Sequence, residues 1–224
     1  MKLGVLLPTF RQGAEDAFGF AREAVDAGID GVFAYDHLWP MGSPERPALA
    51  PFPLLAAVAR RHQHLSVAPL VARVGLVSTA HLVEQFRSVA SWAPGRVIAT
   101  LGTGDRLSAD ENLAYGLSFQ DADERRGLLY SAASVLRDEM PVWIGAGAQA
   151  TNELARSLGV TLNLWDAPLE KVREQCEIGP TSWAGPVPSD LFATLDSLRD
   201  AGVSWAVLGP QVDIAQLKEW RESR

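Results

Sequence analysis

Residues 142–165 read VWIGAGAQATNELARSLGVTLNLW, and this stretch decides the fold. The short apolar run Val142–Gly145 predicts a strand, and Ala148–Leu158 carries apolar residues at helical spacing. Gly159 is the glycine that commonly follows a helix, and Val160–Trp165 predicts the next strand. A strand, a helix and a strand joined by such short turns form one parallel β-α-β unit.

The same alternation extends in both directions until eight apolar runs are each followed by a stretch of helical pattern. The predicted strands are Leu3–Pro8, Gly31–Tyr35, Leu65–Val71, Val97–Leu101, Val142–Gly145, Val160–Trp165, Thr181–Ala184 and Trp205–Leu208. Eight such units predict an α/β fold, the (β/α)8 TIM barrel, whose active site lies at the C-terminal ends of the strands. No linker-like change in composition interrupts the 224 residues, so we expect a single domain over residues 1–224.

Composition narrows the possible partners. The net charge of −7 argues against general affinity for nucleic acid or for an anionic membrane surface. The one cysteine, Cys176, excludes an internal disulfide and fits a reducing compartment. The apolar stretch Leu65–Val77 is broken by Arg73 and is too short to span a bilayer, and the N-terminus has no signal-peptide pattern. We therefore expect a cytoplasmic protein that acts on a small molecule.

The polar residues that follow the strands are the candidates for chemistry. Asp36 and His37 directly follow the second strand, where an imidazole could exchange a proton or a hydrogen bond with a ligand. The alternative is a helix cap beside a half-buried histidine. The histidines show no spacing typical of metal ligands, so we expect no metal site.

Two glycine-rich segments also follow strands. Gly102-Thr103-Gly104-Asp105 either lets the backbone approach a ligand or forms a tight turn. Asp105 and Glu111 would lie at the barrel mouth, although either could cap a helix, and Ser108 with Glu111 has the spacing of a capping box.

Gly145-Ala146-Gly147-Ala148-Gln149-Ala150 opens a helix after a strand and fits the pattern G-x-G-x-x-A. Backbone amides at a helix N-terminus bind phosphate. Asp166 lies where a dinucleotide-binding fold would place its ribose-binding acid, so a Rossmann domain competes with a phosphate loop inside a barrel.

Tryptophans accompany the strand ends. We expect Trp143 and Trp205 to fill the core, whereas Trp165 and Trp183 come late enough in their strands to wall a pocket for a planar ligand.

Taken in order, several of these segments resemble the luciferase-like flavin-dependent oxidoreductases, especially the branch that uses a deazaflavin coenzyme of the F-420 type. The resemblance rests on the following segments: Gly31–Leu38, Leu65–Arg96, Leu101–Asp105 and Pro141–Gly147. It implies a barrel that holds a deazaflavin or FMN at its mouth, and it implies a possible homodimer. Relative to that family, the insertions after Arg137 and near the seventh strand are abbreviated.

The resemblance also assigns roles. Asp36 and His37 would lie beside the redox ring, with His37 positioning substrate or relaying a proton, and Asp105 would act as an acid or a hydrogen-bond partner. A bulge around Pro69–Ala72, often with a cis peptide, would stand behind the ring. The resulting set of cofactor-binding residues is Pro69, Val71, Gly102, Thr103, Gly104, Gly145, Ala146, Gly147 and Trp165.

The leading hypothesis is therefore a flavin- or deazaflavin-dependent oxidoreductase of the luciferase-like monooxygenase type, acting on an organic substrate. Two alternatives are a non-catalytic relative that binds the cofactor and a barrel enzyme that uses a phosphorylated metabolite without a redox cofactor. A Rossmann dehydrogenase is the fourth possibility.

Overall fold

The computed structural model describes residues 1–40, 42–105 and 108–224. Within them, nine parallel strands form one sheet in the order β3-β2-β1-β9-β8-β7-β6-β5-β4. Their bounds are β1 (Lys2–Leu6), β2 (Gly31–Ala34), β3 (Ser66–Pro69), β4 (Ala72–Arg73), β5 (Ala99–Gly102), β6 (Val142–Gly145), β7 (Thr161–Trp165), β8 (Thr181–Gly185) and β9 (Trp205–Leu208). The predicted (β/α)8 barrel is confirmed.

The third predicted strand, Leu65–Val71, is divided into β3 and β4 by a cis peptide bond between Leu70 and Val71. The barrel closes at this point. Val67 pairs in parallel with Val97 just before β5, and β4 continues the pairing with β5. The two pieces thus take the place of one strand in an eight-stranded barrel.

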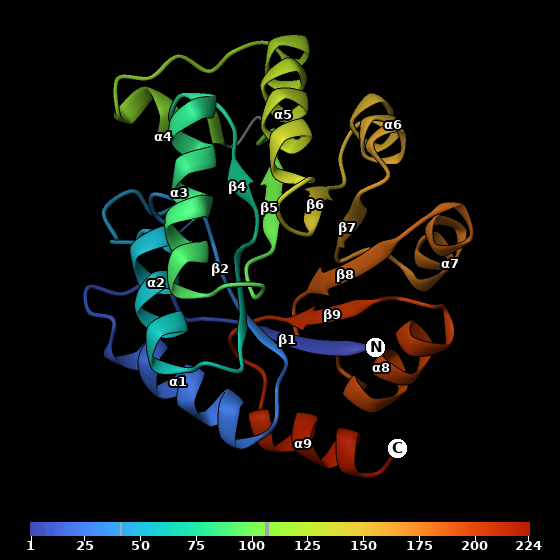
Figure 1. Ribbon diagram of the computed structural model, residues 1–224. Coiled ribbons are helices and arrows are strands. Elements are labelled where there is room, and N and C mark those ends of the chain that lie inside the picture. The colour runs from blue at the N-terminus through green and yellow to red at the C-terminus, as the bar shows by residue number, and fades with distance from the viewer. Residues whose placement is uncertain (41, 106–107) are drawn as a thin grey trace.

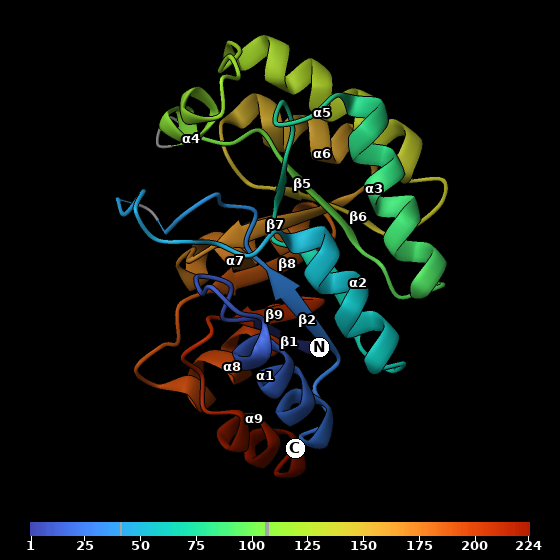
Figure 2. The ribbon, with the colours of Figure 1, turned by 90° about the vertical axis from the view of Figure 1, so that its left-hand side faces the viewer.

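Helices surround the strands on the outside (Figures 1 and 2). Their bounds are α1 (Glu15–Asp26), α2 (Pro51–Arg61), α3 (Thr79–Trp92), α4 (Ala109–Ala114), α5 (Ala122–Leu136), α6 (Gln149–Leu158), α7 (Leu169–Ile178), α8 (Leu191–Asp200) and α9 (Ile214–Glu222). Gly159 follows α6 in the left-handed conformation that the sequence predicts for a glycine there. Among the described residues, no helix has the length and apolar content needed to cross a membrane.

The core has two layers because alternate residues of each strand point to opposite faces. The larger layer lies between the sheet and the helices. The smaller layer fills the barrel and contains Phe33, Trp143 and Trp205, whose ring centroids lie 5.5 to 5.8 Å apart. The expectation that Trp143 and Trp205 fill the core is confirmed. This aromatic packing closes the barrel interior below the C-terminal ends of the strands.

Candidate functional site

The end of β2 presents Tyr35, Asp36 and His37 at the barrel mouth. The Oδ2 atom of Asp36 accepts a hydrogen bond of 2.7 Å from the backbone N–H of Arg73, so this carboxyl ties β2 to β4. Burial raises the pKa of Asp36, although the Arg73 amide and guanidinium oppose the rise. The carboxylate that contacts the His37 ring comes from α4 rather than from the adjacent Asp36.

That carboxylate belongs to Glu111, which is only 2% exposed. Its Oε1 lies 2.8 Å from His37 Nδ1, and its Oε2 accepts a hydrogen bond of 3.2 Å from the backbone N–H of Leu38. The predicted capping box is therefore wrong: Glu111 turns inward to His37, and the side chain of Ser108 makes no capping hydrogen bond to α4. Two residues that are 74 positions apart in sequence form the centre of the site.

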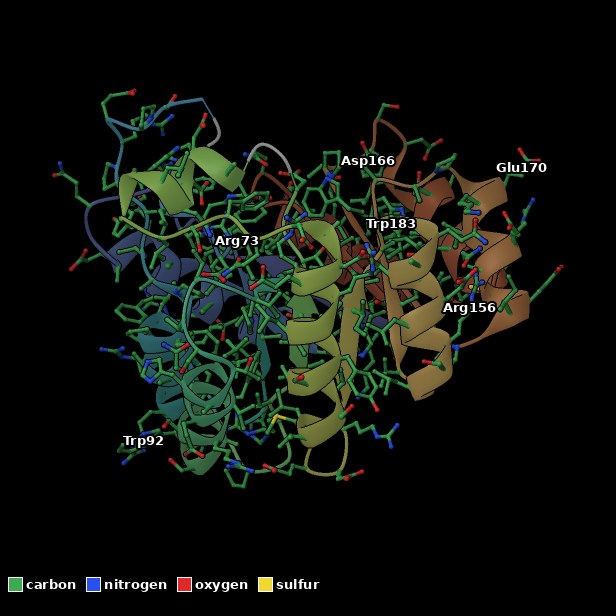
Figure 3. All side chains as sticks on the ribbon, turned by 90° about the horizontal axis from the view of Figure 1, so that it is seen from above. Arg73, Trp92, Arg156, Asp166, Glu170 and Trp183 are labelled. Carbon is green, nitrogen blue, oxygen red and sulfur yellow. The ribbon has the colours of Figure 1, made fainter. Side chains whose placement is uncertain are left out.

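Arg73 completes the cluster, and the sequence analysis did not identify it as functional. The side chain is 4% exposed, and its Nη2 donates a hydrogen bond of 2.7 Å to Glu111 Oε2. Its Nη1 donates one of 3.3 Å to the carbonyl of Ser108. Figure 3 shows Arg73 close to α4 when the molecule is seen from above. The sequence signal that could have identified Arg73 is its position as a lone arginine in the apolar stretch Leu65–Val77, because a buried charge requires a partner.

The electrostatics of Glu111 follow from these contacts. Burial alone would raise its pKa, but the hydrogen bonds and charges of His37 and Arg73 outweigh burial and hold the pKa of Glu111 below its ordinary value. Glu111 is consequently ionised at neutral pH. An ionised carboxylate only accepts hydrogen bonds, so His37 Nδ1 is the donor.

A bulge between β3 and β4 forms the neighbouring wall. The expected cis peptide is present between Leu70 and Val71. The half-buried side chain of Val71 packs over two glycines. A Cβ added to Gly102 would lie 2.4 Å from Val71 Cγ2, and a Cβ added to Gly145 would lie 3.4 Å from the same atom. Gly102 thus leaves room for Val71, whereas a side chain at Gly145 would only touch it. Pro69, at the end of β3, is buried, and its carbonyl accepts a hydrogen bond from the Thr100 hydroxyl.

In the segment 102–105, a glycine also leaves room for a neighbouring side chain. Gly104 has φ +68°, and a Cβ there would lie 2.7 Å from Cδ of Arg73, so glycine is needed for both backbone conformation and space. Thr103 beside it is half-buried. The Oδ1 atom of Asp105 accepts hydrogen bonds from the backbone N–H and the hydroxyl of Ser108, which agrees with the helix-capping alternative for Asp105.

The loop 145–150 connects β6 to α6 at the same end of the barrel. Ala146 and Gly147 are exposed, but their amides have protein partners: Ala146 N–H donates to the Asn163 carbonyl and Gly147 N–H to Asn152 Oδ1 at 3.0 Å. The first N–H groups of α6 itself remain the donors suited to an anion. The Rossmann alternative, with Asp166 as ribose acid, is wrong because the strand order is that of a barrel.

Aromatic rings line the mouth. Tyr35 stacks on Phe10 with 5.4 Å between centroids and meets the edge of Trp165 at 6.1 Å. Burial raises the pKa of Tyr35 to about 12, so its hydroxyl stays protonated at neutral pH. Trp165 is half exposed and is available to a planar ligand. The same expectation for Trp183 is wrong: Trp183 is buried, and its Nε1 donates to the Ala167 carbonyl.

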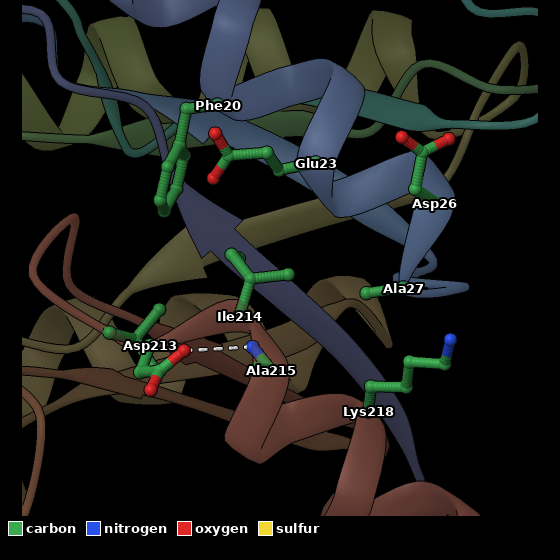
Figure 4. Close-up of a pocket in the computed structure, with 9 residues that line it drawn as sticks. Phe20, Glu23, Asp26, Ala27, Asp213, Ile214, Ala215 and Lys218 are labelled. Atoms are coloured by element: carbon green, nitrogen blue, oxygen red, sulfur yellow. Dashed lines mark hydrogen bonds between the residues drawn. The ribbon is translucent and has the colours of Figure 1, made fainter.

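Outside the barrel, a surface groove of about 420 Å³ lies between α1 and the start of α9 (Figure 4). None of the residues described above lines it. Phe20 and Ile214 form its apolar part, and Glu23, Asp26 and Lys218 carry charges there. The described residues contain no cluster of three or more His, Cys, Asp or Glu side chains that could hold a metal ion.

The site can be compared with known proteins. An F420-dependent glucose-6-phosphate dehydrogenase of Nakamurella multipartita is 27% identical over 161 residues, which cover 71% of this chain and 45% of that protein. An F420-dependent hydroxymycolic acid dehydrogenase of Mycobacterium tuberculosis is 28% identical over 167 residues, which cover 74% of this chain and 44% of that protein. The chain thus spans less than half the length of these two relatives.

Solved structures share the fold. An F420-dependent secondary alcohol dehydrogenase, solved with an F420-acetone adduct, superposes with a TM-score of 0.81 at 14% identity over 97% of each chain. The F420-dependent tetrahydromethanopterin reductase of Methanopyrus kandleri superposes with a TM-score of 0.75 at 11% identity, over 98% of this chain and 96% of that one. The sequence profile of the luciferase-like monooxygenases matches residues 1–138, which is more than half of the chain. The chain belongs to the luciferase-like monooxygenase family.

Proposed function

We propose that the protein is an oxidoreductase that uses a reduced deazaflavin or FMN and acts on an organic small molecule. The observation that carries the proposal is the His37–Glu111–Arg73 cluster, which places a histidine with a fixed ring orientation at the mouth of a luciferase-like barrel. The F420-dependent relatives favour the deazaflavin, and the family to which the chain belongs is consistent with FMN as well.

The residues at the mouth suit a planar redox ring. Val71 offers an apolar surface supported by Gly102 and Gly145, while Trp165 offers an aromatic face that is half exposed. Rings of this kind bind planar ligands by stacking and by apolar contact. The first amides of α6 suit a cofactor phosphate, because N–H groups at a helix N-terminus attract anions. Pro69, Thr103, Gly104, Ala146 and Gly147 complete the proposed cofactor-binding set.

A bound reduced deazaflavin or FMN supplies the hydride, and the protein supplies orientation, a dry environment and control of protons. We assign the proton-handling role to His37. Its Nδ1 is held by Glu111, and its Nε2 has no protein partner within residues 1–40, 42–105 and 108–224. Asp36 holds the bulge through the Arg73 amide, and Asp105 accepts a hydrogen bond from the backbone N–H of Ser108.

The experiment that tests this function follows the absorbance of each reduced cofactor while a panel of aldehydes and ketones, which can accept a hydride, is added under anaerobic conditions, and then in the presence of oxygen. We expect substrate-dependent oxidation of one cofactor by the wild-type protein. Tight binding without substrate-dependent oxidation under any condition would support the non-catalytic relative instead. Binding of phosphate esters with no affinity for either cofactor would support the phosphometabolite enzyme.

The family resemblance also suggests a homodimer, which we propose for the assembly in solution. Light scattering coupled to size-exclusion chromatography tests it. A mass near twice the 24.2 kDa of the chain would agree with a dimer, and a mass near 24.2 kDa at all concentrations would contradict one.

A further inference from the structure

We propose that Glu111 and Arg73 are positioning residues that hold His37 in the Nδ1–H tautomer, so that Nε2, which carries no proton in the neutral ring, is the nitrogen that exchanges a proton with a ligand. The two nitrogens of a neutral imidazole differ, because one donates a hydrogen bond and the other accepts one. The meaning of this assignment for catalysis rests on the proposed function. The tautomer itself is a property of the protein without cofactor.

The direction of the His37–Glu111 hydrogen bond follows from the other contacts of Glu111. Its Oε2 already accepts from two donors, the backbone N–H of Leu38 at 3.2 Å and Arg73 Nη2 at 2.7 Å. Its Oε1 lies 2.8 Å from His37 Nδ1. A carboxylate beside a buried guanidinium stays ionised and has no proton to give. Only a proton on Nδ1 makes the 2.8 Å contact a hydrogen bond.

Arg73 holds Glu111 in place through contacts at both ends of the residue. Its backbone N–H is bound by Asp36, and its guanidinium contacts Glu111 and the Ser108 carbonyl. Its stem packs against Gly104, where a Cβ would lie 2.7 Å from Cδ. Arg73 thus connects the β3–β4 bulge to the carboxylate behind His37. The result is a chain of contacts that fixes the ring orientation and the tautomer together.

This geometry predicts a specific effect of Glu111→Gln. The amide oxygen must take the place of Oε2, because both Leu38 N–H and Arg73 Nη2 donate to that position. The amide NH2 group then faces His37 Nδ1. Since two N–H groups cannot bond to each other, the imidazole proton has to move to Nε2. The substitution should therefore reverse the tautomer while preserving the shape of the site.

The experiment is long-range ¹H–¹⁵N correlation NMR of the full chain labelled at histidine, recorded without cofactor. The pH is raised until the ring signals stop changing, so that all four histidines are neutral. Loss of one set of signals in His37→Asn assigns His37. The exposed carboxylate variant Glu139→Gln is the matched control, because Glu139 contacts Arg87 and no histidine.

We expect the Nδ1–H pattern for His37 in the wild type and in Glu139→Gln, and the Nε2–H pattern in Glu111→Gln. An Nε2–H pattern in the wild type would overturn the proposal, even if Glu111→Gln failed to fold. An unchanged tautomer in a folded Glu111→Gln would overturn it too. Because no cofactor is present, these outcomes are independent of whether the protein binds deazaflavin or FMN.

Discussion

The substitution Glu111→Ala tests the energetic weight of the buried cluster. It removes three hydrogen bonds, from His37 Nδ1, Leu38 N–H and Arg73 Nη2, and it leaves a guanidinium that is 4% exposed without its counter-charge. Arg73 Nε already lacks a partner among the described residues, so the side chain has little means of compensation. We therefore expect Glu111→Ala to be among the more destabilising substitutions in this chain.

Removal of one partner from a buried ion pair costs about 3–5 kcal/mol, because the other charge stays buried and unpaired. For a chain of this size each kcal/mol lowers Tm by about 2–4 °C, so the fall should be roughly 6–20 °C. Urea unfolding followed by circular dichroism measures the free energy, and a thermal melt measures Tm.

Two further variants serve as controls for the buried ion pair. Glu139→Ala removes a carboxylate that pairs with Arg87 at the surface, and it should leave stability nearly unchanged because exposed pairs contribute little. The double variant Arg73→Met with Glu111→Leu removes both buried charges and should recover much of the stability lost in Glu111→Ala. A loss below about 1 kcal/mol in Glu111→Ala would refute the reasoning, since it would match an exposed pair rather than a buried one.

Three other predictions concern the mouth and its pH dependence. Gly102→Ala places a Cβ 2.4 Å from Val71 Cγ2 and should weaken cofactor binding, measured by equilibrium dialysis, about tenfold or more. The control Gly127→Ala adds a Cβ that meets nothing within 4 Å and should leave the affinity unchanged. Equal affinities of the two variants would show that Val71 does not contact the bound ring. His37→Ala should lower turnover more than cofactor affinity, and unchanged turnover would remove His37 from the mechanism. The pKa of Glu111 is lower in the folded than in the unfolded protein, so its ionised side chain adds to the free energy of unfolding. This contribution is complete above the ordinary carboxyl pKa of about 4.3 and is lost as the pH falls through the lower folded-state value. The stability gap between wild type and Glu111→Ala should therefore narrow in acid, and a gap that widens there would contradict the sign of the shift.

The fold followed from sequence because its signals are local. Each apolar run and each helical pattern lies within a few residues, and their alternation leaves few arrangements other than a barrel. Even the short strand β8, Thr181–Gly185, lies where its apolar run predicts it. The division of Leu65–Val71 into β3 and β4 was expected only through the family resemblance, because no local pattern encodes a cis peptide between Leu70 and Val71.

The site was predicted only in part because its contacts are distant in sequence. His37 was identified from its position after a strand, but its partner Glu111 is 74 residues away and had the spacing of a helix cap. Local spacing could not distinguish a carboxylate that caps α4 from one that turns inward. Trp183 was misassigned for a related reason: its late position in a strand does not reveal which face of the sheet it occupies.

The central claim is that a deazaflavin or FMN binds at the barrel mouth beside His37 and Trp165. The most direct measurement is a titration of the wild-type protein and of Trp165→Phe with each cofactor, followed by intrinsic tryptophan fluorescence. We predict saturable quenching of the wild type by at least one cofactor, with a smaller amplitude in Trp165→Phe because the half-exposed indole lies at the mouth. Absence of saturable quenching by both cofactors, with equilibrium dialysis also showing no binding, would contradict the account.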